Sequence, residues 1–184
     1  MATKATVCKA QLQLCDFNRD YFGAHSLTIA QHPSETEERL LMRIVAFALH
    51  ASEALSFTRG LSTEDEPDLW EKDLTGDILC WIDLGQPEEK RVRKACGRAH
   101  QAFIYTYQPR NAGPWWSKYG SEFQRFGNLS VGSLEVENGD IASLYERNMD
   151  LQCTIQDDGI TLSDGAREVI LRLHWLKQAP DHTS

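Results

Sequence analysis

The stretch that decides the fold is Ile78-Leu79-Cys80-Trp81-Ile82-Asp83-Leu84, together with the later run Ala102-Phe103-Ile104-Tyr105-Thr106-Tyr107. The first run is apolar apart from Asp83, which is typical of a strand buried on both faces. Between the runs, a helix is predicted to begin at Gln86-Pro87, with proline at its first position. Its apolar face is formed by Val92, Ala95, Cys96 and Ala99. A strand, a helix and a strand in this order predict two parallel neighbours joined by a right-handed crossover.

Working outward, alternation of apolar and polar residues predicts strands at residues 5–14, 26–31, 55–60, 129–136, 151–155, 160–162 and 169–175. The first two strands form an antiparallel hairpin, and Asp158-Gly159 predicts a second hairpin turn. Ser34 followed by Glu37 is a capping box that opens a helix reaching Leu49. Further helices are predicted at residues 115–126 and 141–149.

The length, composition and net charge of the chain limit which class of protein it can belong to. The chain has 184 residues, of which 41% are hydrophobic and 25% charged, so we expect one globular domain over residues 1–184. The element order predicts an α/β (α+β) fold with a mixed central sheet flanked by helices. No apolar run approaches the ~20 residues of a membrane span, and the start lacks a signal peptide, so we expect a cytoplasmic protein without a membrane partner. The net charge of -8 argues that any nucleic-acid contact is local.

Asp83 is the sharpest candidate for a functional residue. A buried carboxylate without a partner is strongly unfavourable, and the usual partner is a metal ion or a cationic side chain. The following helix carries Arg91, Lys94 and Arg98 on one stripe by their spacing of three and four residues. Two interpretations stay open at this point: a structural ion pair of Asp83 with Arg91 or Lys94, and a functional site.

Other acidic and aromatic residues offer weaker signals. The loop at residues 64–68 contains Asp65 and Glu66, and Mg²⁺ favours such oxygen ligands, although most acidic loops are simply solvated. Glu38 lies four residues before Met42 and is expected to point toward the end of the sheet. Trp115 and Trp116 lie beside Lys118, which suits base stacking, but core packing is the favoured interpretation. The chain contains no HExxH, GxSxG or glycine-rich phosphate loop.

Several phrases give the sequence a resemblance to the YaeQ family over nearly its full length. They are residues 32–39 (HPSETEER), 57–61 (FTRGL), 65–67 (DEP), 81–85 (WIDLG), 91–95 (RVRKA), 128–131 (NLSV) and 154–157 (TIQD). That family is similar in fold to the PD-(D/E)XK nucleases, in which carboxylates gather at one end of a mixed sheet. The resemblance therefore implies a variant of this nuclease fold with extra N- and C-terminal strands.

The resemblance also implies roles for particular residues. Asp83 corresponds to the (D/E) of the motif, Glu66 or Asp65 to the preceding acid, and Glu38 to an acid from the first helix. Gly85 stands where the motif has its lysine, so the cation is expected from the next helix. The candidates for it are Lys94 first and Arg91 second.

These assignments lead to two functional hypotheses. The first is a nuclease that uses Mg²⁺, or Mn²⁺, to activate water, with the metal held by Glu66, Asp83 and Glu38 and the attacking water positioned by Lys94. Its partner would be nucleic acid. The second is a non-catalytic binding protein on a nuclease-like scaffold, acting in transcription regulation.

Overall fold

The computed structural model describes residues 4–62 and 64–180, and in this part of the chain one ten-stranded sheet dominates. The strands are β1 (Thr6–Asp16), β2 (Tyr21–Gln31), β3 (Leu55–Phe57), β4 (Leu69–Lys72), β5 (Ile78–Leu84), β6 (Ala99–Thr106), β7 (Leu129–Asn138), β8 (Asn148–Gln156), β9 (Gly159–Ser163) and β10 (Glu168–Lys177). The helices are α1 (Glu37–Leu49), α2 (Glu89–Arg98) and α3 (Pro109–Phe123), with short 3₁₀ helices η1 (Gly60–Ser62) and η2 (Ile141–Leu144). None of the helices in the described ranges is long and apolar enough to cross a membrane.

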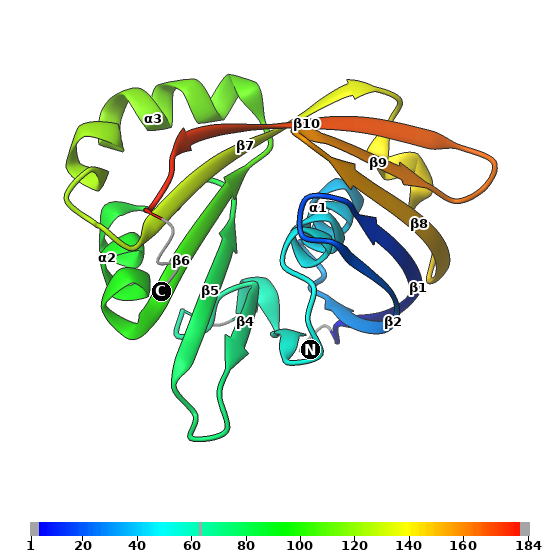
Figure 1. The fold of residues 1–184 in the computed structure, drawn as a ribbon, viewed down its shortest axis with the longest axis horizontal. Helices are drawn as coiled ribbons and strands as arrows, with labels where there is room; N and C mark the ends of the chain where they lie inside the picture. The colour runs from blue at the N-terminus through cyan, green and yellow to red at the C-terminus, as the bar shows by residue number, and fades with distance from the viewer. Residues whose placement is uncertain (1–3, 63, 181–184) are drawn as a thin grey trace.

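The sheet is mixed and strongly curved. Its order is β2-β1-β8-β9-β10-β7-β6-β5-β4-β3, with parallel pairs β1–β8, β5–β6 and β6–β7 and antiparallel pairs elsewhere. Figure 1 shows the sheet curling round α1, while α2 and α3 cover the outer face of β5, β6 and β7. Residues of β1 and β2 line the same groove as residues of β3 and β4, so the two edges of the sheet approach each other and nearly close it. The predicted mixed sheet flanked by helices is confirmed at this level.

The unit at residues 78–107 forms largely as its sequence predicts. β5 covers the whole apolar run, α2 follows, and β6 lies parallel to β5 with Asp83 opposite Ile104. The helix begins at Glu89, later than the proline-based prediction, because Pro87 precedes the capping residue Glu88. Parallel pairing places the carboxyl ends of β5 and β6 at one edge of the sheet, which is where α/β proteins commonly bind ligands.

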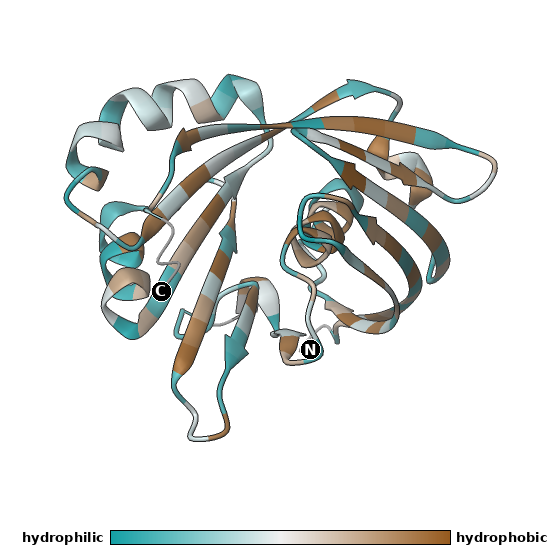
Figure 2. Cartoon of the chain, in the orientation of Figure 1, coloured by the Kyte–Doolittle hydropathy of each residue, from teal (hydrophilic) through white to brown (hydrophobic). Residues whose placement is uncertain are grey.

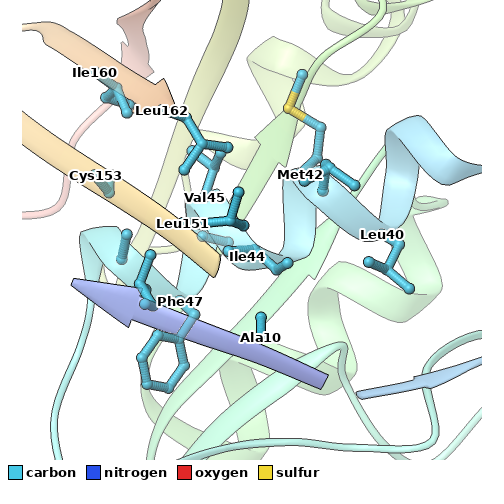
Figure 3. Close-up of a cluster of buried hydrophobic side chains, with 14 of the residues drawn as sticks. Ala10, Leu40, Met42, Ile44, Val45, Phe47, Leu151, Cys153, Ile160 and Leu162 are labelled. Atoms are coloured by element: carbon cyan, nitrogen blue, oxygen red, sulfur yellow. The ribbon is translucent and has the colours of Figure 1, made fainter. Parts of the chain in front are cut away.

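The main core lies between α1 and the concave face of the sheet. Helix α1 buries almost every side chain from Leu40 to Ala48, which anchors it firmly inside the curved sheet. Figure 3 shows Met42, Val45 and Leu151 among the side chains that fill this space. Figure 2 shows hydrophobic residues in α1 and in bands along β1 and β8. Burying each large apolar side chain contributes roughly 1.5–3 kcal/mol.

A second, smaller hydrophobic core lies between the sheet and helices α2 and α3. Trp81, fully buried, packs there with Phe123 and Trp115. The indole Nε1 of Trp115 donates to the carbonyl of Pro87 at 2.9 Å. Trp115 is therefore a core residue, as the favoured interpretation expected.

Three local predictions differ from the structure. The helix predicted at residues 141–149 is wrong: η2 is a single short turn, and β8 begins at Asn148 because its alternating burial and its parallel pairing with β1 favour a strand. Helix α1 begins at Glu37 and is capped by Thr36, whose hydroxyl accepts from the Arg39 amide at 3.1 Å. The second hairpin turns at residues 157–158, one residue earlier than predicted.

Candidate functional site

A cleft of about 610 Å³ opens at the carboxyl end of β5. Its walls are formed by Arg39, Gly60, Leu61, Glu64, Asp68, Asp83, Leu84, Gly85, Gln86, Pro87, Arg91 and Tyr107. Two buried carboxylates, those of Asp68 and Asp83, and two guanidinium groups therefore face one space. They are contributed by the residue before β4, the end of β5, α1 and α2. This concentration of buried charge makes the cleft the strongest candidate for a functional site.

Asp83 lies at the floor of the cleft and is only 3% exposed. Its Oδ2 accepts from Arg91 Nε at 2.9 Å and from Trp81 Nε1 at 3.0 Å, and its Oδ1 accepts from Arg91 Nη2 at 2.9 Å. Burial raises the pKa of the Asp83 carboxyl, against the hydrogen bonds from Arg91, and the negative charge of Asp68 adds to this rise. The two acids are thus close enough to affect each other.

Asp68 is the second buried acid, 3% exposed. Antiparallel pairing of β4 with β5 brings it beside Asp83, since its own amide donates to the Ile82 carbonyl at 3.0 Å. The amide of Leu84 donates back to Asp68 Oδ2 at 2.8 Å. Arg39 completes the arrangement, with its Nη2 2.9 Å from Asp68 Oδ1.

Glu35, which lies just before α1, forms ion pairs with both Arg39 and Arg43 of that helix. Glu35, almost fully buried, accepts from Arg39 Nη1 at 2.7 Å and from Arg43 Nη2 at 2.6 Å. Arg43 is completely buried, and its Nε and Nη1 have no hydrogen-bond partner within the described residues. Together with Asp68, Asp83 and Arg91, these side chains make three acids and three arginines, a set with no net charge.

Arg91 and its neighbours on α2 also hold the segment that precedes Asp68. Arg91 donates to the carbonyls of Glu64 at 3.2 Å and Glu66 at 2.8 Å. Arg98 donates to the Asp65 carbonyl at 2.8 Å, and the Lys94 ammonium forms an ion pair with the Asp65 carboxylate. The basic stripe predicted on this helix therefore binds mostly main-chain carbonyls.

The structure places the residues predicted for the site at different locations. Asp83 and Arg91 line the cleft and pair with each other, which is one of the two ion pairs that the sequence left open. Lys94 and Asp65 pair outside it, and Glu66 lines the groove between the sheet edges. Within residues 4–62 and 64–180, no three His, Cys, Asp or Glu side chains are arranged to hold a metal ion.

Glu38 lies near the cleft without lining it. It is half-buried in the first turn of α1. Burial raises the pKa of the Tyr107 hydroxyl at the cleft wall, and the negative charge of Glu38 adds to that rise. Glu38 therefore acts on the cleft at most through its charge.

Sequence reasoning included Asp68 only as the last residue of the acidic loop at residues 64–68, and it missed Arg39 and the ion pairs of Glu35. A signal for Asp68 was available, because this acid follows a proline and immediately precedes the apolar pair at residues 69–70, the position of a strand start. Glu35, Arg39 and Arg43 recur at four-residue spacing, which places them along one line near the helix start. From the sequence alone, the helix dipole explains Glu35 well enough, because a negative charge at the start of a helix is favourable.

The turn after β5 explains the absence of a lysine side chain at this edge. Gly85 has φ +98, a conformation that side-chain-bearing residues rarely adopt. A Cβ there would meet no atom within 4 Å, so the restriction comes from the backbone alone. The next residue, Gln86, lines the cleft, and its Nε2 is buried with no partner in the described part of the chain.

Comparisons with known proteins agree with this architecture and with the resemblance. The family model described as YaeQ protein matches residues 1–173. The chain belongs to the YaeQ family. It is 44% identical over 176 residues to the uncharacterized protein YaeQ of Salmonella typhi, covering 94% of this chain and 96% of that protein. With the YaeQ protein of Escherichia coli (strain K12) it shares 42% over 174 residues, again 94% and 96% of the two chains.

Two crystal structures of YaeQ proteins have the same fold. The protein from Xanthomonas axonopodis pv. citri matches with a TM-score of 0.89 at 45% identity, covering 96% of this chain and 99% of that one. The protein from Pseudomonas syringae matches with a TM-score of 0.88 at 30% identity, covering 95% and 97%. The fold of this chain is therefore shared with these two YaeQ proteins.

Proposed function

We propose that the cleft is the active site of a divalent-cation-dependent phosphodiesterase that acts on nucleic acid, built on a variant of the PD-(D/E)XK fold. The observation that carries the proposal is the pair of buried acids, Asp68 and Asp83, held side by side by neighbouring strands. Their sequence context supports it: residues 67–68 read Pro-Asp, and residues 83–85 read Asp-Leu-Gly. These match the two halves of the motif apart from the final lysine. Asp68 thereby replaces Glu66 and Asp65 as the preceding acid.

The donor set suits a magnesium or manganese ion. Mg²⁺ is commonly bound through one or two carboxylates while keeping several waters and taking oxygens from substrate phosphates. Asp68 Oδ2 accepts the hydrogen bonds from Arg39 and Leu84, whereas Asp68 Oδ1 is only in ion-pair contact with Arg39. Among the described residues, Asp83 Oδ1 accepts one hydrogen bond, from Arg91, so the Oδ1 atom of each acid retains a lone pair for a cation. Two adjacent buried carboxylates also repel each other, and a cation between them relieves that repulsion.

The chain's own side chains supply the rest of the chemistry. When bound, the cation would lower the pKa of a coordinated water and neutralise charge on the phosphate. Arg39 and Arg91 present guanidinium groups at the cleft wall, where they suit the oxygens of a phosphodiester. Trp81 fixes the orientation of Asp83 through its indole hydrogen bond. Arg91, rather than Lys94, is the cation from α2 that reaches the cleft.

A second candidate function is a binding protein that holds a phosphate-containing ligand without cleaving it, with a role in transcription regulation. Gly85 favours it, because this position supplies no side chain to activate water. The two functions predict the same ligand contacts and differ only in turnover.

Incubating the purified protein with labelled single- and double-stranded DNA and RNA, plus Mg²⁺ or Mn²⁺, tests the proposal. Cleavage is expected from the wild type and is expected to be lost in Asp83→Asn and Asp68→Asn. The matched controls Asp65→Asn and Glu66→Gln change acids outside the cleft and should keep activity. Cleavage that survives Asp83→Asn contradicts the proposal, whereas cation-dependent binding without any cleavage supports the binding protein.

A further inference from the structure

We infer that Arg91 is the internal counter-ion of Asp83 in the cation-free protein, and that it transfers to a phosphate oxygen when a divalent cation binds. Cation and phosphodiester then bind cooperatively. This inference rests on the proposed function, because it concerns the same acid pair. It adds a mode of regulation: the cleft takes up its cation well only together with its substrate.

The first support is the pairing of Arg91 with both carboxylate oxygens of Asp83. Two parallel hydrogen bonds, both 2.9 Å, join the guanidinium to the two carboxylate oxygens. Such a fork is among the strongest pairings of an arginine with a carboxylate. A divalent cation on the same carboxylate would lie close to the guanidinium, and in a buried site two positive charges at such a separation repel strongly. The guanidinium and the cation therefore compete for Asp83.

The second support is that the side chain of Arg91 reaches solvent whereas that of Asp83 does not. The side chain of Arg91 is 30% exposed, but that of Asp83 is only 4% exposed and is also held by Trp81. Arg91 lines both the cleft and the adjoining groove formed with Glu88 and Lys90. Its helix is anchored by buried Val92 and Ala95, so the guanidinium can turn over the cleft while the main chain of α2 stays in place.

The third support is the charge balance of the cleft. Glu35, Asp68 and Asp83 neutralise Arg39, Arg43 and Arg91, so the cation-free network carries no net charge. A divalent cation alone would add two positive charges to this neutral network, and the other acid of the cleft wall, Glu64, is exposed to solvent and compensates them only weakly. A phosphodiester supplies negative charge and acceptor oxygens for the displaced guanidinium. Each ligand thus favours the other, and by linkage the coupling is reciprocal.

Calorimetric titration with Ca²⁺, with and without a saturating single-stranded DNA oligonucleotide, tests this inference without relying on turnover. For the wild type, the oligonucleotide should tighten Ca²⁺ binding by roughly tenfold or more, within the usual range of coupling between sites. Arg91→Met should bind Ca²⁺ at least about tenfold more tightly in the absence of DNA and should lose most of the coupling. Tryptophan fluorescence gives a second readout through the indole of Trp81, with Trp81→Phe as its control.

Two further variants guard against misinterpretation. Arg91→Lys keeps the charge but cannot form the fork, so it should show intermediate coupling if Arg91→Met folds poorly. Arg93→Met removes an exposed arginine of the same helix that pairs with Glu89, and it should behave as the wild type.

The outcomes separate this inference from the proposed function. It is overturned if Arg91→Met binds Ca²⁺ no more tightly than the wild type, or if coupling persists unchanged in that variant, even where nucleic acid is cleaved. Coupling that depends on Arg91 but comes without any cleavage supports the inference and contradicts the proposed catalysis. Absence of Ca²⁺ binding in the wild type and all variants, with and without DNA, overturns both.

Discussion

The guanidinium of Arg91 holds the carboxylate of Asp83 through two parallel hydrogen bonds at the floor of a cleft, while the remaining donors of Arg91 bind the carbonyls of Glu64 and Glu66. One side chain thus ties the end of β5 to the segment that leads into Asp68. The pairing satisfies a buried charge, and it also occupies the group best suited to a divalent cation.

Removing one member of this pair should be more destabilising than removing both. Arg91→Met leaves the Asp83 charge buried with Trp81 as its one remaining hydrogen-bond partner among the described residues. We therefore expect a loss of about 2–4 kcal/mol in the free energy of unfolding. Adding Asp83→Asn should restore much of that loss, giving a coupling energy of at least ~1 kcal/mol in a double-mutant cycle. Urea denaturation measures it. Strictly additive effects would mean that the ion pair contributes nothing.

Two glycine-to-alanine substitutions should change the free energy of unfolding in opposite directions. Gly85→Ala forces a side chain into a left-handed conformation at φ +98 and should lower the free energy of unfolding by about 1–2 kcal/mol. Gly97→Ala, at an exposed position of α2 where an added Cβ meets no atom within 4 Å, should raise the same free energy by about 0.5–1 kcal/mol. Thermal or urea denaturation compares them. An unchanged Gly85→Ala would remove the backbone explanation for glycine at this position.

Stability should fall at acidic pH because of His50. Burial lowers the pKa of His50 to about 3, and its Nε2 is hydrogen-bonded to the Tyr105 hydroxyl at 2.5 Å. The unfolded chain binds a proton near pH 6.5, whereas the folded chain does not, so stability is lost as pH decreases from about 6.5 toward 3. The loss from this group is roughly 1.4 kcal/mol per pH unit within that window.

Replacing His50 by phenylalanine tests this pH dependence. The variant should show a visibly flatter decline of stability between pH 6 and pH 4, measured by urea denaturation at each pH. A decline identical to that of the wild type would assign the acid sensitivity to other groups.

Binding of nucleic acid should depend only weakly on salt. Two guanidinium groups, Arg39 and Arg91, face the cleft, and the protein carries a net charge of -8, so few phosphates are contacted. Each neutralised phosphate contributes about -0.7 to -0.9 to the slope of log affinity against log salt, which predicts a slope no steeper than about -2. Fluorescence anisotropy measures it. A slope on the order of -5 would indicate a far larger footprint.

The sequence predicts the central unit well and the acid pair only in part. The apolar run at residues 78–84 is a strand because both its faces are buried, a property that its composition expresses directly. Asp68 was not singled out within its acidic loop because its importance comes from tertiary pairing: β4 is short, and its register with β5 brings this acid to Asp83. Lys94 was favoured over Arg91 since spacing along a helix does not tell which long side chain reaches inward.

The helix predicted at residues 141–149 failed for a related reason. Helix η2 ends at Leu144, and from Asn148 onward alternate residues are buried against α1 as β8 joins β1. Polar and apolar residues alternate from Asn148 to Gln156, which is a local strand signal that the helix prediction overlooked at its start. Parallel pairing with β1, more than a hundred residues earlier in the chain, then fixes this segment in the sheet. Similarly, Glu35 pairs with Arg39 and Arg43 inside the fold, although its position before a helix suggested only a favourable surface charge.

Locating Mn²⁺ by anomalous scattering, in crystals of the protein grown with a bound oligonucleotide, tests the acid-pair site most directly. The account predicts one strong peak between Asp68 and Asp83, with an oxygen of each carboxylate as a ligand and the Arg91 guanidinium displaced toward a phosphate. A peak on Glu66 or Asp65, or no peak in the cleft while Arg91 still holds Asp83, would contradict it.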